Sequence, residues 1–161
     1  MVVEVMVADY GNPEQGDDLV YLLNLYSQDE MGQGAPLSAD VQANLITELA
    51  KRPHAFSVLA YVDGKAAGLA NCFEGFSSFK AKPLINIHDV FVHGDFRGLK
   101  LSHRILDAIE RRARQIGCCK ITLEVLQGNH PAKRSYEKFG FRSYELDPEL
   151  GSALFWEKSL T

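Results

Sequence analysis

Cysteine is scarce in this sequence, which argues against a disulfide framework and against a zinc site. Only three cysteines are present, an odd number, and two of them are adjacent. No histidine or second cysteine pair lies at the spacing of zinc ligands. We therefore expect no metal site and interpret Cys72, Cys118 and Cys119 as small apolar residues in or near the core.

Long hydrophobic runs and an excess of basic residues are also missing. No apolar run approaches the roughly 20 residues that span a bilayer, and the first residues lack the basic and apolar segments of a secretory signal. The formal net charge of -4 argues against broad binding to a nucleic-acid backbone, which requires a basic face. These absences predict a cytoplasmic protein that binds neither membrane nor nucleic acid.

Strand and helix patterns alternate in the order β-α-α-β-β-β-α-β-α-β-β along a chain whose 161 residues favour one domain, 1–161. Asp63-Gly64 separates two runs of strand-forming residues and is a strong hairpin signal. The segment 84–126 has the pattern of a strand–helix–strand crossover. This order predicts an α+β, or three-layer α/β, fold in which helices cover a mixed sheet. The expected strands lie near 2–8, 55–62, 65–76, 84–92, 120–126, 141–145 and 153–159.

Capping residues mark the expected helices. Ser38 is a suitable N-cap, and Asn129 is placed to begin a later helix. A further amphipathic pattern begins near Gly98 and ends at Gly117, and Gly140 follows the last helical pattern. Gly117 and Gly140 are expected to end these helices.

The segment VFVHGDFRGLKLSHRIL, residues 90–106, runs from a strand through a polar turn into an amphipathic helix. A helix start presents unpaired backbone N–H groups and the positive end of the helix dipole. Arg97 and Lys100 add cationic side chains, Gly98 permits close approach, and Ser102 offers a hydroxyl, which together suit a pyrophosphate. The alternative is that Gly98 only turns the chain and that both cations are solvated. Neither a Gly-x-Gly-x-x-Gly fingerprint nor a P-loop is present.

This segment, together with TLEVLQGNHPAKRSYEKFGF, resembles the GNAT superfamily of acyl-CoA-dependent N-acetyltransferases. The family pattern opens a helix with Arg/Gln-x-x-Gly-x-Gly/Ala, and the second pattern places Asn129 and Tyr136 before Gly140-Phe141. The usual loop glycine is Lys100 here, so a positive φ would cost about 1–2 kcal/mol of backbone strain. The first pattern falls on Arg97, Gly98, Leu99, Lys100, Leu101 and Ser102.

The resemblance implies a mostly antiparallel central sheet with helices on both faces and acetyl-CoA as the acetyl donor. Backbone amides of the loop would hold the CoA pyrophosphate, and Asn129 would bond the cofactor or shape the gap between strands, or only cap its helix. Tyr136 would be the acid that protonates the departing thiolate, although its spacing alone favours a core position. The pantetheine arm and the acetyl carbonyl would be held by Val90, Phe91 and Val92.

Two carboxylates compete for the role of general base that removes the proton of the amine. Glu124 lies mid-strand in the expected strand 120–126 and matches the catalytic Glu of ribosomal-protein N-terminal acetyltransferases. Asp89 interrupts the strand before the cofactor triplet and resembles the acidic position of spermidine/spermine acetyltransferases. Either carboxylate could instead pair with a nearby cation or lie at a solvated position. The sequence favours Glu124 and Asp89 almost equally as the general base.

The acceptor is expected to be a small amine or polyamine, because residues 68–97 and the closing ALFWEKS lean toward the spermidine/spermine branch. The amine is expected to attack the thioester directly within a ternary complex. Self-association is expected from the resemblance alone. Three alternatives stay open: a protein N-terminal or lysine acetyltransferase, a non-catalytic acyl-CoA-binding module, and a structural or interaction domain.

Overall fold

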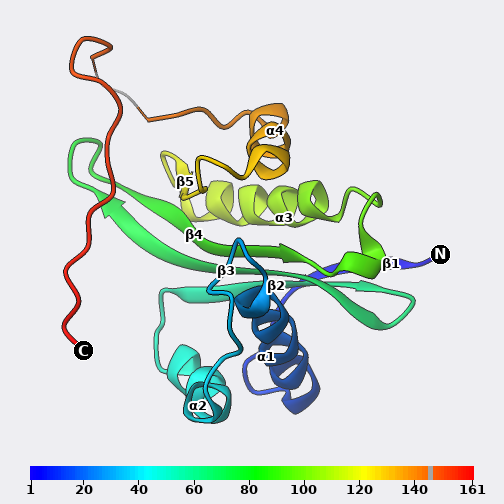
Figure 1. The fold of residues 1–161 in the computed structure, drawn as a ribbon. Helices are drawn as coiled ribbons and strands as arrows, with labels where there is room; N and C mark the ends of the chain where they lie inside the picture. Colours follow the sequence, from blue (N-terminus) through cyan, green and yellow to red (C-terminus); the bar gives the residue numbers. More distant parts are fainter. Residues whose placement is uncertain (145–146) are drawn as a thin grey trace.

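One five-stranded sheet organises the fold, which a computed structural model describes over residues 1–144 and 147–161. The strands lie side by side in sequence order, and the first four are antiparallel neighbours. The last pair is parallel, so the predicted mixed, mostly antiparallel sheet is confirmed (Figure 1). The strands are β1 (Val3–Val7), β2 (Ala55–Val62), β3 (Lys65–Ser77), β4 (Lys82–Val92) and β5 (Ile121–Leu123).

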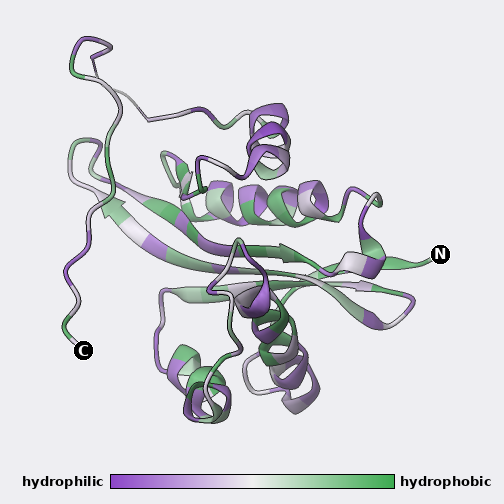
Figure 2. Ribbon diagram, viewed as in Figure 1, coloured by the Kyte–Doolittle hydropathy of each residue, from purple (hydrophilic) through white to green (hydrophobic). Residues whose placement is uncertain are grey.

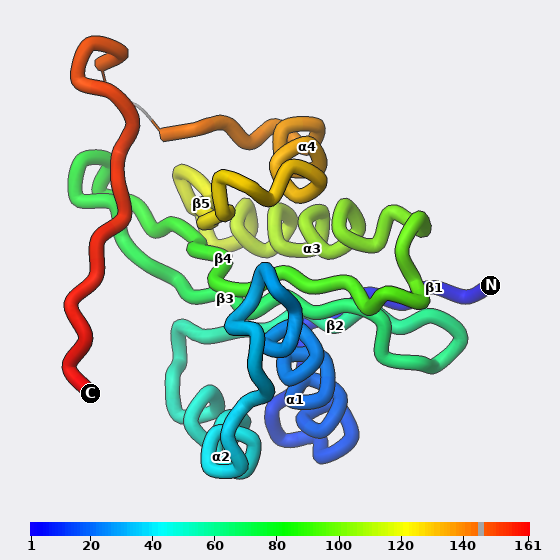
Figure 3. Tube along the Cα trace, viewed as in Figure 1, coloured from blue at the N-terminus to red at the C-terminus, as the bar shows by residue number. Residues whose placement is uncertain are grey.

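Helices cover both faces of this sheet, as predicted. Figure 1 shows α1 (Pro13–Gln28) and α2 (Ala39–Ala50) on one face and α3 (Leu101–Ile116) and α4 (His130–Phe139) on the other. Figure 3 traces the chain from β4 through the short 3-10 helix η1 (Gly94–Phe96) into α3, which returns toward β5. None of the helices in the described ranges combines the length and apolar character needed to cross a membrane.

Local signals in the sequence explain where these elements turn and end. Ser38 caps α2 by accepting a hydrogen bond from the backbone N–H of Val41 at 3.2 Å. Asp63 and Gly64 both have positive φ, 48° and 77°, as the tight hairpin between β2 and β3 requires. Gly117 ends α3 with φ 86°, and Gly140 ends α4 with φ 115°.

The core divides into layers that the sheet separates. Leu19 and Leu22 of α1 are fully buried and pack with Leu59 and Leu69 of the sheet. On the opposite face, α3 buries Ile105 and its neighbours against β2, β3 and β4. Figure 2 shows this amphipathic pattern as alternating hydrophobic and hydrophilic bands along α3. Burial on both faces makes the sheet a rigid support for the groups at its edge.

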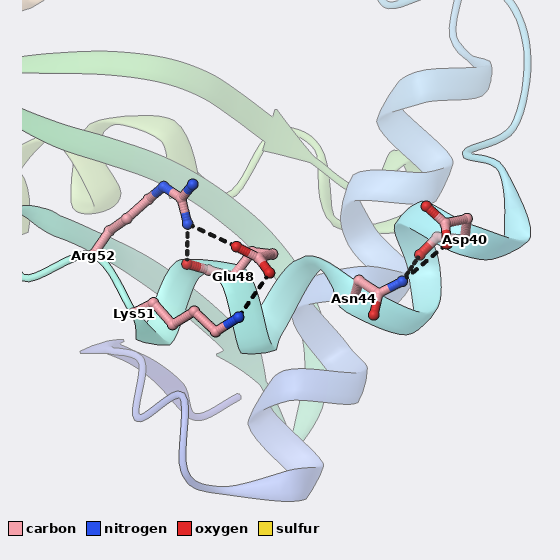
Figure 4. Close-up of polar contacts among 5 residues, drawn as sticks. All are labelled: Asp40, Asn44, Glu48, Lys51 and Arg52. Atoms are coloured by element: carbon pink, nitrogen blue, oxygen red, sulfur yellow. Dashed lines mark hydrogen bonds and ion pairs between the residues drawn. The ribbon is translucent and has the colours of Figure 1, made fainter.

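Charged side chains cover the solvent-facing side of α2. Glu48 accepts hydrogen bonds from Lys51 and Arg52, both at 3.0 Å, and these lower the pKa of the Glu48 carboxyl (Figure 4). Asn44 donates to the side chain of Asp40 at 3.1 Å. Exposed pairs of this kind contribute little to stability. The contribution of α2 to stability therefore comes from the side that packs on the core, not from these exposed pairs.

The structure corrects the predicted C-terminal strands. β5 is three residues long instead of covering 120–126, and residues 141–144 and 153–159 form no strand. Glu145, the last residue predicted for the first closing strand, lies outside the described residues. Aromatic and β-branched residues favour a strand only where a neighbouring backbone can complete the hydrogen bonds, and β5 loses that neighbour after Leu123.

Residues 147–161, which we call the C-terminal arm, extend away from the core (Figure 1). Every residue of the arm is exposed, including its large apolar side chains. Leu154, Phe155 and Trp156 are 76%, 74% and 81% exposed. A hydrogen bond from Ala153 N–H to the Tyr144 carbonyl at 3.3 Å links the arm to the segment before it.

Candidate functional site

The two parallel strands separate at the middle of β4. Their pairing runs from Ile85 with Ile121 to Ile87 with Leu123, where β5 ends. β4 continues for five more residues to Val92, and its outer edge has no strand partner there within residues 1–144 and 147–161. An extended backbone with a free edge can pair with the amides of a bound ligand as a further strand would. The predicted triplet Val90, Phe91 and Val92 lies on this free edge.

A β-bulge marks the point of separation. Asn71 of β3 faces Asp89, whereas the next residue, Cys72, faces Ile87, so His88 is the extra residue of β4. Bulges bend a strand and change the direction in which its side chains point. Asn71 donates a hydrogen bond from Nδ2 to Oδ2 of Asp89 at 3.0 Å. The Asp89 carboxylate is therefore held beside the free edge.

The loop at the end of β4 has the form of an anion site. Arg97 is exposed and extended, and Gly98 has φ 84°. Lys100 occupies the N-cap of α3 in the left-handed conformation, with φ 58° and ψ 30° and no side-chain cap. The first-turn N–H groups of a helix have no partner within the helix. These amides and two exposed cations, Arg97 and Lys100, therefore lie in one turn at the end of β4.

The remaining loop residues anchor this turn. Leu99 packs on a small cluster that includes the buried Leu101, so their side chains serve packing and only their backbone is available to a ligand. The Ser102 hydroxyl lies 3.4 Å from that of Ser135 and joins α3 to α4.

Replacing Lys100 with glycine is expected to raise the free energy of unfolding by about 1 kcal/mol, because it removes left-handed strain that exceeds glycine's entropic cost. Urea denaturation measures the change. Gly98→Ala is the matched control and should destabilise by about 1–2 kcal/mol through backbone strain. No steric clash contributes to this loss, since an added Cβ meets no atom within 4 Å. Destabilisation by Lys100→Gly would contradict the assignment of strain.

Helix α4 brings an aromatic hydroxyl toward the site. Asn129 caps α4 by accepting from the N–H of Ala132 at 3.4 Å, so its helix-capping role is confirmed. Tyr136 is half-buried and packs edge-on against Phe141, with 6.0 Å between ring centroids. Burial raises the pKa of Tyr136 to about 12, with a smaller contribution from Tyr26. The phenol is therefore protonated at neutral pH.

A cavity of about 290 Å³ opens between α1, the turn after it and β4. Leu23 and Tyr26 of α1 line one side, Met31 and Gln33 come from the turn, and Asp89 comes from β4. The other lining residues are Ser27, Gly32 and Leu37, so Asp89 is the charged member of this lining. A cavity with one carboxylate in a neutral wall suits a ligand with one positive charge.

Electrostatics connect Tyr26, Asp89 and Tyr136. Burial raises the pKa of Tyr26, and the charges of Asp89 and Asp29 raise it further. Tyr26 in turn acts on Tyr136, although α1 and α4 lie on opposite faces of the sheet. Tyr26 also stacks on Phe91, with 5.7 Å between ring centroids. Tyr26 and Asp89 thus line one cavity beside the free edge of β4, and Tyr136 packs against the same core cluster as Val90 of that edge.

Sequence reasoning placed Glu124 in the middle of a strand, and this was wrong. Glu124 follows the last residue of β5 and is exposed. It does not line the cavity that holds Asp89. Tyr26 and Asn71 were missed as site residues. Tyr26 fits an apolar helix pattern, and the only signal for Asn71 was a polar residue among small apolar ones in the hairpin 55–77.

The helix start with its two cations, next to the free edge of β4, matches the arrangement that the resemblance to acyl-CoA-dependent N-acetyltransferases implies. The model of the acetyltransferase (GNAT) family matches residues 19–141, and the chain belongs to this family. It is therefore an N-acetyltransferase, and its family uses acetyl-CoA as the acetyl donor. The open edge and the loop amides fit such a donor.

Solved structures share this fold over nearly the whole chain. A crystal structure of a probable acetyltransferase has a TM-score of 0.81 at 19% identity, covering 97% of this chain and 99% of the other. AAC(6')-Iy in complex with the bisubstrate analogue CoA-S-monomethyl-acetylneamine has a TM-score of 0.77 at 17% identity, covering 99% of each chain. Ribosomal-protein-alanine N-acetyltransferase from Brucella melitensis biovar Abortus 2308 has a TM-score of 0.69 at 17% identity, covering 91% of this chain and 99% of the other.

Proposed function

We propose that this protein transfers the acetyl group of acetyl-CoA to the primary amine of a small acceptor bound beside Asp89. The observation that carries this proposal is the position of Asp89, which is the charged group of a cavity next to the free edge of β4. A carboxylate there attracts an ammonium group to the edge along which the acetyl donor would lie. The free thiols at Cys72, Cys118 and Cys119 favour action in the reducing cytoplasm.

The donor would be held by two parts of the chain. Amides from Leu99 to Ser102 bind the pyrophosphate at the start of α3, and Arg97 and Lys100 neutralise its charge. The backbone of Val90, Phe91 and Val92 holds the pantetheine arm, and one of its N–H groups polarises the acetyl carbonyl. Asn129 acts through α4, because its cap fixes the helix that carries Tyr136.

Asp89 would act as the general base. A lysine-like amine has a reference pKa of about 10.4, so it arrives protonated and cannot attack until its proton is removed. Asp89 accepts this proton, the neutral nitrogen bonds to the carbonyl carbon, and the carbon–sulfur bond breaks. Tyr136 donates its hydroxyl proton toward the departing thiolate and regains one from the nitrogen, which loses its second proton as the amide forms. The products are the amide, the CoA thiol and one proton on Asp89. Direct transfer needs no cysteine nucleophile, and Cys72 would be a poor one, because burial raises the pKa of its thiol.

The cavity favours a small amine with one positive charge and a short neutral body, because Asp89 is the charged member of its lining. A polyamine is the second candidate. Asp29, which follows α1 and acts on Tyr26, would supply the carboxylate for a second ammonium group. This candidate keeps the likeness to the spermidine/spermine branch.

Release of the CoA thiol from acetyl-CoA, measured across monoamines, polyamines, aminoglycosides, amino acids and short peptides, tests the proposal. We expect saturable release with small monoamines. Preference for polyamines would favour the second candidate, and release with peptides alone would identify a protein acetyltransferase. Binding of acetyl-CoA without release across the panel would leave a non-catalytic acyl-CoA-binding module.

We also propose that two copies associate through the C-terminal arm. The arm carries Leu154, Phe155, Trp156 and Leu160 exposed, and the outer edge of β5 has no strand partner in the described residues. Aromatic side chains bury about 150–250 Å² each. Phe155 and Trp156 of two arms are four such side chains and together supply roughly 600–1,000 Å². The leucines and the backbone would bring this toward the 1,200 Å² or so of a stable interface.

Light scattering after size-exclusion chromatography is expected to show a dimer for the wild type and a monomer for Trp156→Glu. Phe79→Ser is the matched control, because Phe79 is 89% exposed in the β3–β4 hairpin and outside the arm. This control should remain dimeric. A monomeric wild type would refute the proposed association.

A further inference from the structure

A continuous chain of four hydrogen-bonded side chains ends at Asp89. The Tyr10 hydroxyl lies 2.9 Å from that of Ser57, which lies 2.6 Å from Oδ1 of Asn71. Asn71 in turn contacts Asp89 at 3.0 Å. The chain begins in the loop before α1, crosses β2 and β3, and reaches the bulge of β4.

The direction of every bond in this chain is determined. The Asp89 carboxylate only accepts, so the Asn71 amide group must face it with its N–H and turn its carbonyl oxygen toward Ser57. Ser57 then donates its single hydroxyl proton to Asn71, so Tyr10 must be the donor to Ser57. All donors therefore point toward Asp89.

Burial makes this arrangement rigid. Asn71 is 3% exposed and Ser57 is fully buried, so neither can exchange its partner for water. A buried amide that turned over would place its carbonyl oxygen against the Asp89 carboxylate, so that two acceptors would face each other with no proton between them. Asp89 is thus held through Oδ2 while it lines the cavity.

We infer that Asn71, locked by Ser57 and Tyr10, is a positioning residue for acetyl transfer, which acts by orienting the Asp89 carboxylate toward the acceptor amine. This inference rests on the proposed function, in which Asp89 is the base. The chain does not conduct protons, because an amide N–H cannot pass on a proton in the way a hydroxyl can. Its role is to fix one oxygen so that the other meets the amine.

A double-mutant cycle in turnover distinguishes positioning from a structural role. Asn71→Leu is expected to lower kcat with the amine on the order of 10²-fold, the effect of misplacing a reacting group by about 1 Å, while KM for acetyl-CoA is unchanged. In an Asp89→Asn background, the same substitution should cause no further loss, because Asn71 acts through Asp89. A structural residue would instead lower turnover by the same factor in both backgrounds.

Two milder variants keep the test valid if Asn71→Leu does not fold. Ser57→Ala should lower kcat by roughly 2–10-fold through the loss of one neutral hydrogen bond, and Tyr10→Phe should lower it less. Tyr61→Phe is the matched control for Tyr10, because Tyr61 donates to Asp18 at 2.8 Å, outside the chain. Asn86→Leu is the control for Asn71, because Asn86 bonds to Thr122.

The outcomes separate the two proposals. If Asn71→Leu lowers kcat only in the background that keeps Asp89, the result supports the inference. Equal loss in both backgrounds, or none in the wild-type background, overturns it and leaves acetyl transfer intact. A wild type without acetyl transfer to any amine refutes the proposed function itself, and the inference with it.

Discussion

Tyr136→Phe is expected to lower turnover by about 10²–10⁴-fold, the usual contribution of a positioned acid. The substitution removes one hydroxyl and keeps the ring that packs against Phe141, so folding and acetyl-CoA affinity should be unchanged. Because burial raises the pKa of Tyr136 to about 12, the hydroxyl keeps its proton through neutral and mildly alkaline pH. Initial rates and acetyl-CoA binding, measured on the same preparations, check both statements.

The raised pKa also limits how Tyr136 acts. A thiol has a reference pKa of about 8.5, so complete proton transfer from this phenol to a free thiolate would be unfavourable. A hydrogen bond that strengthens as the carbon–sulfur bond breaks requires no such transfer beforehand. Tyr144→Phe is the matched control, because Tyr144 is 53% exposed and its loss should leave turnover unchanged. Full turnover by Tyr136→Phe would remove its hydroxyl from the mechanism.

Local features of the fold could be predicted because the residues that make them are neighbours in the chain. The left-handed glycines at 98, 117 and 140, the Asp63-Gly64 hairpin and the caps at Ser38 and Asn129 each depend on a few consecutive residues. The helix start after β4 belongs to this group. The sequence pattern of its loop is recognisable although a lysine stands where glycine is usual. The backbone at this lysine adopts the left-handed conformation.

The choice between Asp89 and Glu124 could not be made in this way. It depends on where β5 loses its partner, which follows from the bulge at His88 and the course of β4. Asn71 and Tyr26 reach the site from β3 and α1 through contacts between distant segments. The prediction of the closing strands was wrong for a related reason, because strand-forming residues such as Trp156 do not by themselves specify a partner strand.

Asp89→Asn is expected to lower kcat/KM for the amine by about 10²–10⁴-fold at neutral pH, because it removes the acceptor of the ammonium proton. The Asn71 hydrogen bond can persist, since an asparagine oxygen also accepts. Glu124→Gln is the matched control. Glu124 is exposed beyond the end of β5, so its loss should change kcat/KM by less than about twofold.

The pH dependence of this deficit identifies the proton that Asp89 removes. Below the amine's reference pKa of about 10.4, each unit of pH raises the neutral fraction about tenfold, so a variant without the base should recover as pH rises toward 10. The ratio of wild-type to Asp89→Asn rates should therefore shrink with increasing pH. A constant ratio would mean that Asp89 only binds the cation, and a larger loss in Glu124→Gln would transfer the role of base to Glu124.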